Sequence, residues 1–331
     1  MTGLTSADVA REAGVSRTTV SYVLNGTGTA RISEATAERV RATARRLGYA
    51  PSAAARTLRR GRNDLVLCVL PNWPVGPVLD TLLDHLATAL AAHGLSTLVH
   101  HNRGPQRLAE LWREVTPRAV VGLTRFAPDD ERAMHEAGIL VVRTSLDPDC
   151  EPGVFAVPQT CIGRLQVDHL AERGHQVLGY AAPMDPRVVE FVERRLAGVR
   201  AGCEQRGLPE PVVLDLEAEV ASAASAVRAW RAGAGPGGGP VTAVAAYNDD
   251  VALAVLAGAR AEGVAVPGEL AVVGVDDVPA ARLAAPALTT VWQAVDDQAE
   301  YLAATVLAHL EGTEPPARPG EIFHVVARDS T

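Results

Sequence analysis

Apolar strand-like runs and amphipathic helical stretches alternate along most of this chain, from residue 63 to the C-terminus. The first series contains the runs LVLCVLP, STLVHH, AVVGLT and ILVVRT, with helical stretches between them. The second series contains GVFAV, VLGYAAP, PVVLDL, TAVAAYN and LAVVGVDD. Strands that alternate with helices form parallel sheets covered by helices on both faces. We therefore predict an α/β body of two similar parallel-sheet subdomains with a cleft between them.

The first 62 residues differ from the rest of the chain in charge. They hold 11 arginines and 4 acidic residues, a net charge of +7, although the whole chain has a net charge of −8. Residues 63–331 hold 20 arginines and 35 acidic residues, a net charge of −15, and the chain contains no lysine. A basic segment on an acidic body indicates a polyanionic partner for the basic segment.

Three short helical patterns follow one another in residues 1–50 and predict an all-α segment. Their N-cap candidates are Thr5 or Ser6, Ser16, and Ser33. The residues at which they should end are Gly14, Asn25 and Gly48. The first two helices, joined at Gly14-Val15, match a helix-turn-helix, whose second helix lies in the DNA major groove with its N-terminal residues against base edges.

The second of these helices, within VSRTTVSYVLNG, carries an unusual set of side chains. Small hydroxyl residues allow close approach of the backbone to DNA, and Arg17 can form a bidentate contact with guanine. The alternative is a plain three-helix subdomain with solvated hydroxyls. The separate charge asymmetry of residues 1–62 favours DNA binding.

The segments DVAREAGVS, TTVS, VLNG, RLGYAPS and AAR give residues 4–60 a dense resemblance to the LacI/GalR family of bacterial transcription regulators. The resemblance implies that Arg17, Thr18 and Tyr22 are base-reading residues, although the family usually has Arg or His at the position of Tyr22. The loop NGTGTARIS, which contains Arg31, is about two residues longer than is usual in the family. The DNA-contacting residues that the resemblance implies are Thr5, Ser6, Ser16, Arg17, Thr18, Thr19, Ser21, Tyr22, Asn25, Arg31, Ser52, Ala55, Leu58 and Arg59.

Residues 51–62, PSAAARTLRRGR, predict a short hinge helix. Pro51 suits the first position of a helix, and three alanines follow, but so short a helix is marginal alone in water. The resemblance implies that hinge helices from two subunits enter the minor groove together, where Leu58 wedges between bases and kinks the duplex. The alternative is a basic flexible linker.

The body resembles the effector domain of the same family, itself similar to periplasmic sugar-binding proteins. The segments that carry this are HLAERGHQVLGY, RRLAGVRAGCEQRGL, VTAVAAYNDDVALAVLAGARAEGVAVPGELAVVGVDDV and APALTTVWQ. The implied domains are residues 1–50 for DNA binding, 51–62 for the hinge and 63–331 for effector binding and dimerisation. Crossovers between the two subdomains are expected near residues 157–162, 288–293 and 318–322.

Ligands of such folds lie at the carboxyl ends of the strands, in the cleft. The resemblance places Arg195, Asn248 and Asp276 among the polar effector contacts, and Val78 and Leu79 where the family commonly has aromatic residues. The alternative is a structural role, with Asp276 capping a loop and Asn248-Asp249 capping the next helix. Aromatic residues that could stack on a ligand instead of packing in the core are Trp73, Tyr180, Tyr247 and Trp292.

Enzyme motifs are missing from the sequence, which has no G-x-S-x-G and no P-loop. His100 and His101 have no carboxylate or cysteine at metal-ligand spacing, which favours solvated histidines over a zinc site. We expect no catalytic residues, no cofactor and no metal ion. The apolar runs are shorter than 18 residues and no signal peptide is recognisable, so we expect a cytoplasmic protein with reduced thiols and no membrane partner.

These observations together predict a cytoplasmic, homodimeric transcription regulator, most simply a repressor. Its expected partners are a near-palindromic double-stranded DNA operator and a small sugar-like effector in the cleft. One alternative is a cytosolic small-molecule-binding protein with only nonspecific or architectural DNA binding. A secreted sugar-binding protein is opposed by the basic N-terminal segment.

Overall fold

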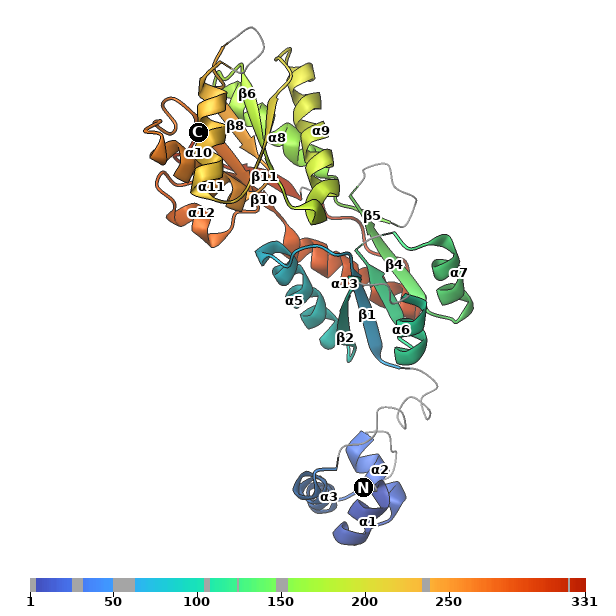
Figure 1. The fold of residues 1–331 in the computed structure, drawn as a ribbon. Helices are drawn as coiled ribbons and strands as arrows, with labels where there is room; N and C mark the ends of the chain where they lie inside the picture. Colours follow the sequence, from blue (N-terminus) through green and yellow to red (C-terminus); the bar gives the residue numbers. More distant parts are fainter. Residues whose placement is uncertain are drawn as a thin grey trace. The chain divides into compact units, whose positions relative to one another are not determined.

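A computed structural model of the chain describes residues 4–25, 32–49, 63–103, 108–123, 125–146, 154–233, 239–320 and 322–331 (Figure 1). The chain divides into two units, an N-terminal unit Met1–Asp64 and a C-terminal unit Leu65–Thr331. The predicted hinge, with Ser52, Ala55, Leu58 and Arg59, lies outside the described residues, as does Arg31.

Helices α1 (Ser6–Ala13), α2 (Arg17–Asn25) and α3 (Glu34–Leu47) form the described part of the N-terminal unit. They pack around six buried side chains: Val9, Ala10, Ala13, Val20, Val40 and Ala44. The caps follow the sequence pattern. Thr5 is the N-cap of α1, Ser16 Oγ accepts a hydrogen bond from Thr19 N at 3.0 Å, and Gly14 ends α1 with φ of 66°. The first two helices therefore have the tight connection that a helix-turn-helix requires.

The first subdomain of the C-terminal unit is built on a five-stranded parallel sheet in the order β2-β1-β3-β4-β5. Its strands are β1 (Leu65–Leu70), β2 (Ser96–His101), β3 (Ala119–Gly122), β4 (Leu140–Ser145) and β5 (Phe155–Ala156). Its helices are α5 (Pro77–Ala91), α6 (Leu108–Val115), α7 (Pro128–Glu136) and α13 (Val295–Glu311). Alternate residues of β1 are buried against α5 and α13 on one face and against α6 and α7 on the other.

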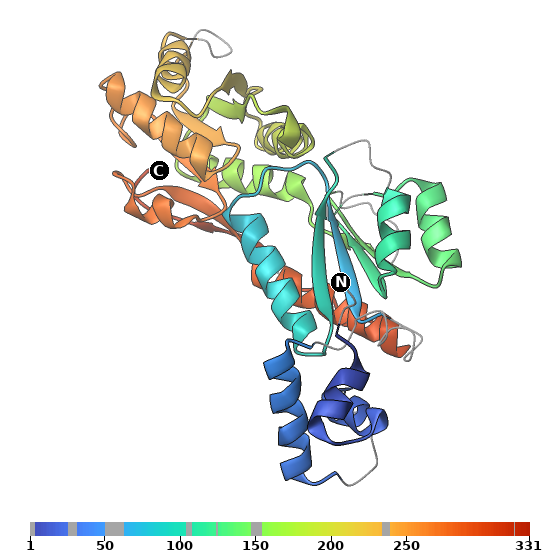
Figure 2. The same cartoon turned by 60° about the horizontal axis from the view of Figure 1, so that its bottom comes forward.

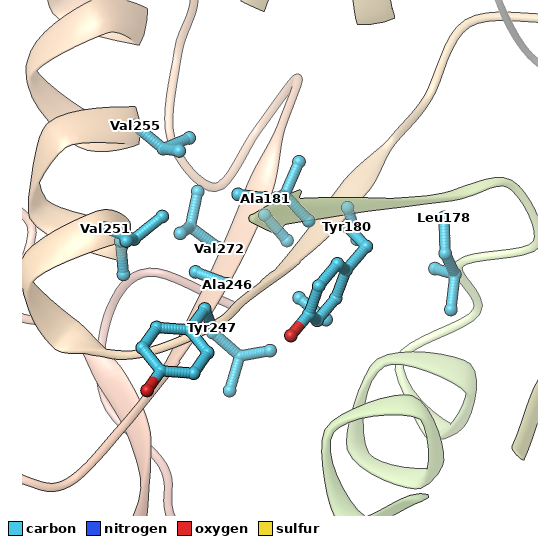
Figure 3. Close-up of a cluster of buried hydrophobic side chains, with 14 of the residues drawn as sticks. Leu178, Tyr180, Ala181, Ala246, Tyr247, Val251, Val255 and Val272 are labelled. Carbon is cyan, nitrogen blue, oxygen red and sulfur yellow. The ribbon is translucent and has the colours of Figure 1, made fainter. Parts of the chain in front are cut away.

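The second subdomain contains a six-stranded sheet in the order β11-β10-β9-β8-β6-β7. Its strands are β6 (Leu178–Pro183), β7 (Val212–Leu216), β8 (Ala243–Ala246), β9 (Ala271–Val275), β10 (Thr289–Gln293) and β11 (Phe323–Val326). Its helices are α8 (Gln159–Glu172), α9 (Val189–Gln205), which a short 3₁₀ turn precedes, α10 (Val220–Arg231), α11 (Asp249–Ala261) and α12 (Pro279–Leu283). Figure 3 shows part of its core, with Tyr180 among Leu178, Ala181 and Ala246.

The predicted fold class is confirmed, with one difference at a sheet edge. Strand β11 runs antiparallel to β10, with Trp292 opposite His324, whereas strand–helix alternation predicts parallel strands. The reason is the route of the chain, because β11 follows an extended return from α13 in the first subdomain rather than a helix of its own sheet. The chain passes between the two sheets after β5, after β10 and after α13.

Helix α13 is an element that the strand–helix alternation does not predict. It follows β10 of the second sheet but packs beside α5 in the first subdomain (Figures 1 and 2). Its buried apolar residues, Ala299, Leu302, Ala303 and Val306, recur at three- and four-residue spacing. The helical repeat is thus present in the sequence, and what the sequence lacks is a sign of which sheet the helix covers.

Helices α8 and α9 approach each other so closely that their backbones are in contact at two glycines. A Cβ atom on Gly163 would lie 2.1 Å from the carbonyl oxygen of Arg195, and a Cβ on Gly198 would lie 2.1 Å from that of Thr160. No larger residue fits at either position without moving a helix. This contact sets the position of α9 and of the side chains that it carries.

Among the described residues, no helix is both long enough and apolar enough to span a bilayer.

Candidate functional site

A cavity of about 290 Å³ lies between the two sheets of the C-terminal unit. All five residues that the sequence suggests for the effector line it: Val78, Leu79, Arg195, Asn248 and Asp276. Asp276 follows strand β9 directly and Asn248 follows β8 after one residue, so the cavity is at the carboxyl ends of the second sheet. This edge is where ligands of open α/β sheets bind.

Arg195, on α9, is the best-fixed polar side chain of the cavity. It is buried, with 4% of its surface exposed. Its Nε donates to Gln159 Oε1 at 2.9 Å and its Nη1 donates to the carbonyl oxygen of Tyr247 at 2.6 Å. Its guanidinium carbon lies 4.8 Å from the centre of the Tyr247 ring, and its Nη2 lies 3.9 Å from Asp276 Oδ1. The guanidinium is therefore held in one orientation, stacked on an aromatic face and paired with a carboxylate.

Asp276 has an unusual backbone for an aspartate, with φ of 109°. Gln293 Nε2 donates to its Oδ1 at 2.6 Å. Burial raises the pKa of Asp276 to about 6, and the opposing effect of Arg195 keeps it from rising further. The side chain holds Gln293 rather than capping a backbone loop. The Asp276 carboxylate offers acceptors and the neighbouring Arg195 guanidinium offers donors, which together suit vicinal hydroxyl groups.

Asn248 has the structural role that the alternative interpretation gives it. Its Oδ1 accepts a hydrogen bond from Val251 N at 3.0 Å and caps α11. Capping the helix uses one of the two lone pairs of Oδ1, so the amide nitrogen and the second lone pair are left for a ligand.

The side of the cavity that belongs to the first subdomain is mainly apolar. It includes Val78, Leu79, Leu82, Leu123, Leu146, Phe155 and Leu302. Of the four candidate stacking residues, Trp73 and Tyr247 line the cavity, and Trp73 contacts Phe191 edge-to-face at 4.7 Å. Tyr180 lies in the core (Figure 3), and Trp292 stacks on His324 in an adjoining depression.

Three lining glutamines were not predicted: Gln159, Gln293 and Gln298. Gln159 begins α8 just after one crossover, and Gln293 ends β10 just before another. Their place at crossovers is the only signal in the sequence that could have found them. Among the described residues, no group of three or more His, Cys, Asp or Glu side chains could hold a metal ion.

Asp249 is buried next to the residues that line the cavity but does not line it. It is fully buried, its Oδ1 accepts from Thr290 Oγ1 at 2.6 Å, and its Oδ2 accepts from Val278 N at 2.9 Å. A Cβ on Gly274 would lie 2.1 Å from its Oδ1. Asp249 therefore ties α11 to β10 and to the loop that carries Asp276.

We expect Asp249→Asn to change how stability depends on pH. Burial raises the pKa of Asp249 from 3.8 to about 7, so the folded state retains a proton that the unfolded state releases. Stability that this group contributes below pH 3.8 is then lost as pH rises through about 7. Asparagine has no charge to bury. Melting temperatures measured from pH 4 to 8 should rise for the variant relative to the wild type by an amount equivalent to about 1–3 kcal/mol. A difference that stays constant with pH would contradict this role.

Arg17 stands apart among the described arginines of the N-terminal unit. Four of them form ion pairs within the unit: Arg11, Arg41, Arg45 and Arg46. Arg39 donates to the carbonyl oxygen of Ala13 at 3.1 Å. Arg17, exposed in the first turn of α2, is the one described arginine of this unit with no hydrogen bond or ion pair to the rest of the chain. Its guanidinium is available to an external acceptor.

The other predicted DNA contacts in the described residues lie on α1, on α2 or at their N-caps. Ser16 and Thr18 are exposed, while Thr19, Ser21 and Tyr22 are half-buried on the same helix or its cap. Thr5 and Ser6 begin α1, and Asn25 is the last residue of α2. The N-terminal turn of α2 thus presents hydroxyls and one free guanidinium.

Both parts of the chain match known protein families. A family described as bacterial regulatory proteins, lacI family, matches residues 5–52, and one described as a periplasmic binding protein-like domain matches residues 167–331. The HTH-type transcriptional regulator GntR of Pseudomonas aeruginosa is 31% identical over 98% of this chain and 94% of its own length. GalR of Escherichia coli is 30% identical over 92% of this chain and 88% of its own length.

Solved structures agree on the fold. A complex of the transcriptional regulator CelR with cellobiose has a TM-score of 0.65 and 27% identity, covering 99% of this chain and 100% of that one. The lac repressor dimer bound to operator and the anti-inducer ONPF has a TM-score of 0.79 and 20% identity. The match covers 99% of this chain and 98% of that one. The resemblance found in the sequence is confirmed, and the chain belongs to the LacI family, as a transcriptional regulator with a helix-turn-helix DNA-binding domain and a periplasmic-binding-protein-like domain.

Proposed function

We propose that this regulator is a repressor that binds a near-palindromic operator as a homodimer, and that a sugar or sugar derivative in the cavity sets its affinity for DNA. The observation that carries the proposal is the buried Arg195–Asp276 pair, 3.9 Å apart in a cavity between two subdomains. Buried charges are costly unless paired, and a pair at the edge of a cavity is typical of a binding site. The chain crosses between the two subdomains three times, so a ligand bound between them can bias their relative position.

The assignment of residues to roles is part of the same proposal. Residues 1–50 bind DNA, residues 51–62 are the hinge with Leu58 in the minor groove, and residues 63–331 bind the effector and dimerise. The lac repressor structure is described as a dimer on its operator, and the CelR structure as a complex with cellobiose. Both descriptions support a dimer with a sugar-type effector here.

A ligand screen tests the effector part. Melting temperatures are measured with a panel of mono- and disaccharides that includes cellobiose. A ligand at about 100 times its dissociation constant adds roughly 2.7 kcal/mol of stability and should raise the melting temperature visibly. A panel without any such rise would count against a sugar effector. Footprinting on genomic fragments tests the DNA part, since operator recognition gives discrete two-fold sites and architectural binding does not.

We expect Arg17→Ala to relax base preference at one position in each half-site of the operator. Loss of a bidentate base contact costs about 1–3 kcal/mol for the preferred sequence and much less for random DNA. Arg45→Ala is the matched control, because Arg45 is exposed on α3 but already paired with Glu38. Competition binding to a set of single-base operator variants gives the measurement. An equal loss of affinity for specific and nonspecific DNA would mean that Arg17 contacts a phosphate rather than a base.

A further inference from the structure

Gln298 is a buried polar residue whose hydrogen bonding is incomplete. It lies in the first turn of α13, lines the cavity and has 6% of its surface exposed. Among the residues that the structure describes, none accepts a hydrogen bond from its Nε2. Buried donors in native proteins are nearly always paired, and an unpaired one carries a free-energy cost. The described part of the chain therefore supplies no acceptor for this donor.

The position of Gln298 differs from that of the other polar lining groups. Arg195, Asn248, Asp276 and Gln293 all belong to the second subdomain. Gln298 belongs to α13, whose following residues are buried in the core of the first subdomain. The wall around it is apolar apart from Thr144. The cavity therefore has a polar side that can bind several hydroxyls, and an opposite, apolar side that offers the amide donor of Gln298.

We propose that Gln298 is a specificity residue for the cavity ligand, and that its Nε2 donates to one acceptor on the otherwise apolar part of a neutral glycoside or nucleoside. This inference rests on the proposed function of the cavity as the effector site. The sugar hydroxyls bind on the side of Arg195 and Asp276, and the ring attached to the sugar lies against the apolar wall.

A free monosaccharide fits this cavity poorly. It carries hydroxyls around its whole edge, and those facing Leu123, Phe155 and Leu302 would lose their water without gaining partners. An anionic ligand is also disfavoured, because the lining residues Asp250 and Asp276 outnumber the one arginine. A neutral ligand with a hydroxylated end and an acceptor-bearing ring satisfies both sides.

Such a ligand would also bridge the two subdomains. Gln293 and Gln298 lie at the two ends of the crossover from β10 to α13. Gln293 contacts Asp276 on the polar side. Gln298 lines the apolar side, and its amide, which is buried in this structure, would turn toward the cavity to meet the ligand. Binding at both ends couples the ligand to the relative position of the two sheets.

The test compares Gln298→Leu with the wild type by calorimetric titration. The probes are glucose and galactose, the phenyl and 4-nitrophenyl β-glycosides of each, and the nucleosides uridine and adenosine. We expect at least one nitrophenyl glycoside or nucleoside to bind the wild type about tenfold more tightly than either monosaccharide. Gln298→Leu should lose about tenfold of that affinity, and should leave binding of the matching phenyl glycoside, which lacks the ring acceptor, unchanged.

Stability without ligand gives a second readout. Replacing an unpaired buried amide by leucine should leave the melting temperature unchanged or raise it, whereas loss of a structural hydrogen bond would lower it. Thr305→Val is the control on the same helix, because Thr305 is equally buried but bonds Tyr301 O and does not line the cavity. It should leave ligand affinity unchanged.

Four results would overturn the inference: equally tight binding of a monosaccharide, equal losses for phenyl and nitrophenyl glycosides, a lower melting temperature with unchanged affinity, or no binding by any probe. The proposed function can be judged separately. If Asp276→Asn abolishes binding of every probe while Gln298→Leu changes none, the cavity is the effector site and only the role of Gln298 is wrong.

Discussion

Gly163→Ala should destabilise the C-terminal unit more than any conservative surface substitution. Its Cβ would lie 2.1 Å from the carbonyl oxygen of Arg195 and 2.6 Å from Val199 N, and both are backbone atoms that no rotamer change can remove. Alanine gains about 1 kcal/mol of helix propensity over glycine, but overpacking of this kind costs typically 1–3 kcal/mol and more when two helices must separate. The cost outweighs the gain.

The same substitution should weaken ligand binding, because the helix that moves carries Arg195. We expect a melting temperature lower by about 5–10 °C, together with a loss of affinity for any cavity ligand. Gly268→Ala is the control, since its Cβ would meet only Ala265 Cβ, at 3.8 Å. Calorimetric melting and ligand titration give both numbers. A Gly163→Ala variant as stable as the control would mean that α8 and α9 are not in backbone contact.

Asp276→Asn should abolish the response to ligand and leave DNA binding intact. The substitution keeps the shape of the side chain and the contact with Gln293, but it removes the charge that pairs with Arg195 and one of the two carboxylate acceptors. Removing one charged partner from a buried site costs about 2–5 kcal/mol of binding, or at least about 30-fold in affinity. The DNA-binding helices belong to a separate unit and should be unaffected.

The pH profile of ligand binding distinguishes this role from a general loss of structure. The ionised carboxylate is the acceptor, and its pKa is about 6, so wild-type affinity should fall as pH drops through 6. The weaker binding that remains in the asparagine variant at high ligand concentration should show no such fall. Asp215→Asn, an exposed aspartate on β7, should behave as the wild type. Full ligand response in Asp276→Asn would place the effector elsewhere.

The sequence predicts much of this molecule where residues carry a local signal. The caps at Thr5, Ser16 and Gly14 follow from turn chemistry, and the buried strands follow from apolar runs. Arg195 and Asp276 come from the family resemblance, which places them among the polar effector contacts before any geometry is known. In the structure both residues line the cavity between the two subdomains.

The remaining features depend on tertiary contacts that no local pattern encodes. Helix α13 has a clear helical repeat, but only packing decides that it covers the sheet of the first subdomain. The antiparallel direction of β11 depends on the path of the preceding return. Gln293 and Gln298 carry no motif, and they matter because a crossover brings both to the cavity. Asp249 looks like a helix cap in the sequence, and its burial appears only when β10 and the loop at Val278 close over it.

If a ligand in the cavity controls binding of DNA by α2, the two binding equilibria are linked, and a titration of each ligand in the presence of the other measures the linkage. Affinity for a footprinted operator is measured by fluorescence anisotropy with and without saturating concentrations of the ligand that most stabilises the wild type. We predict a change in operator affinity of about 5–150-fold, and by linkage the same factor in ligand affinity when operator is saturating. Asp276→Asn should show neither change. Operator affinity that is identical with and without bound ligand would show that the cavity ligand does not regulate DNA binding.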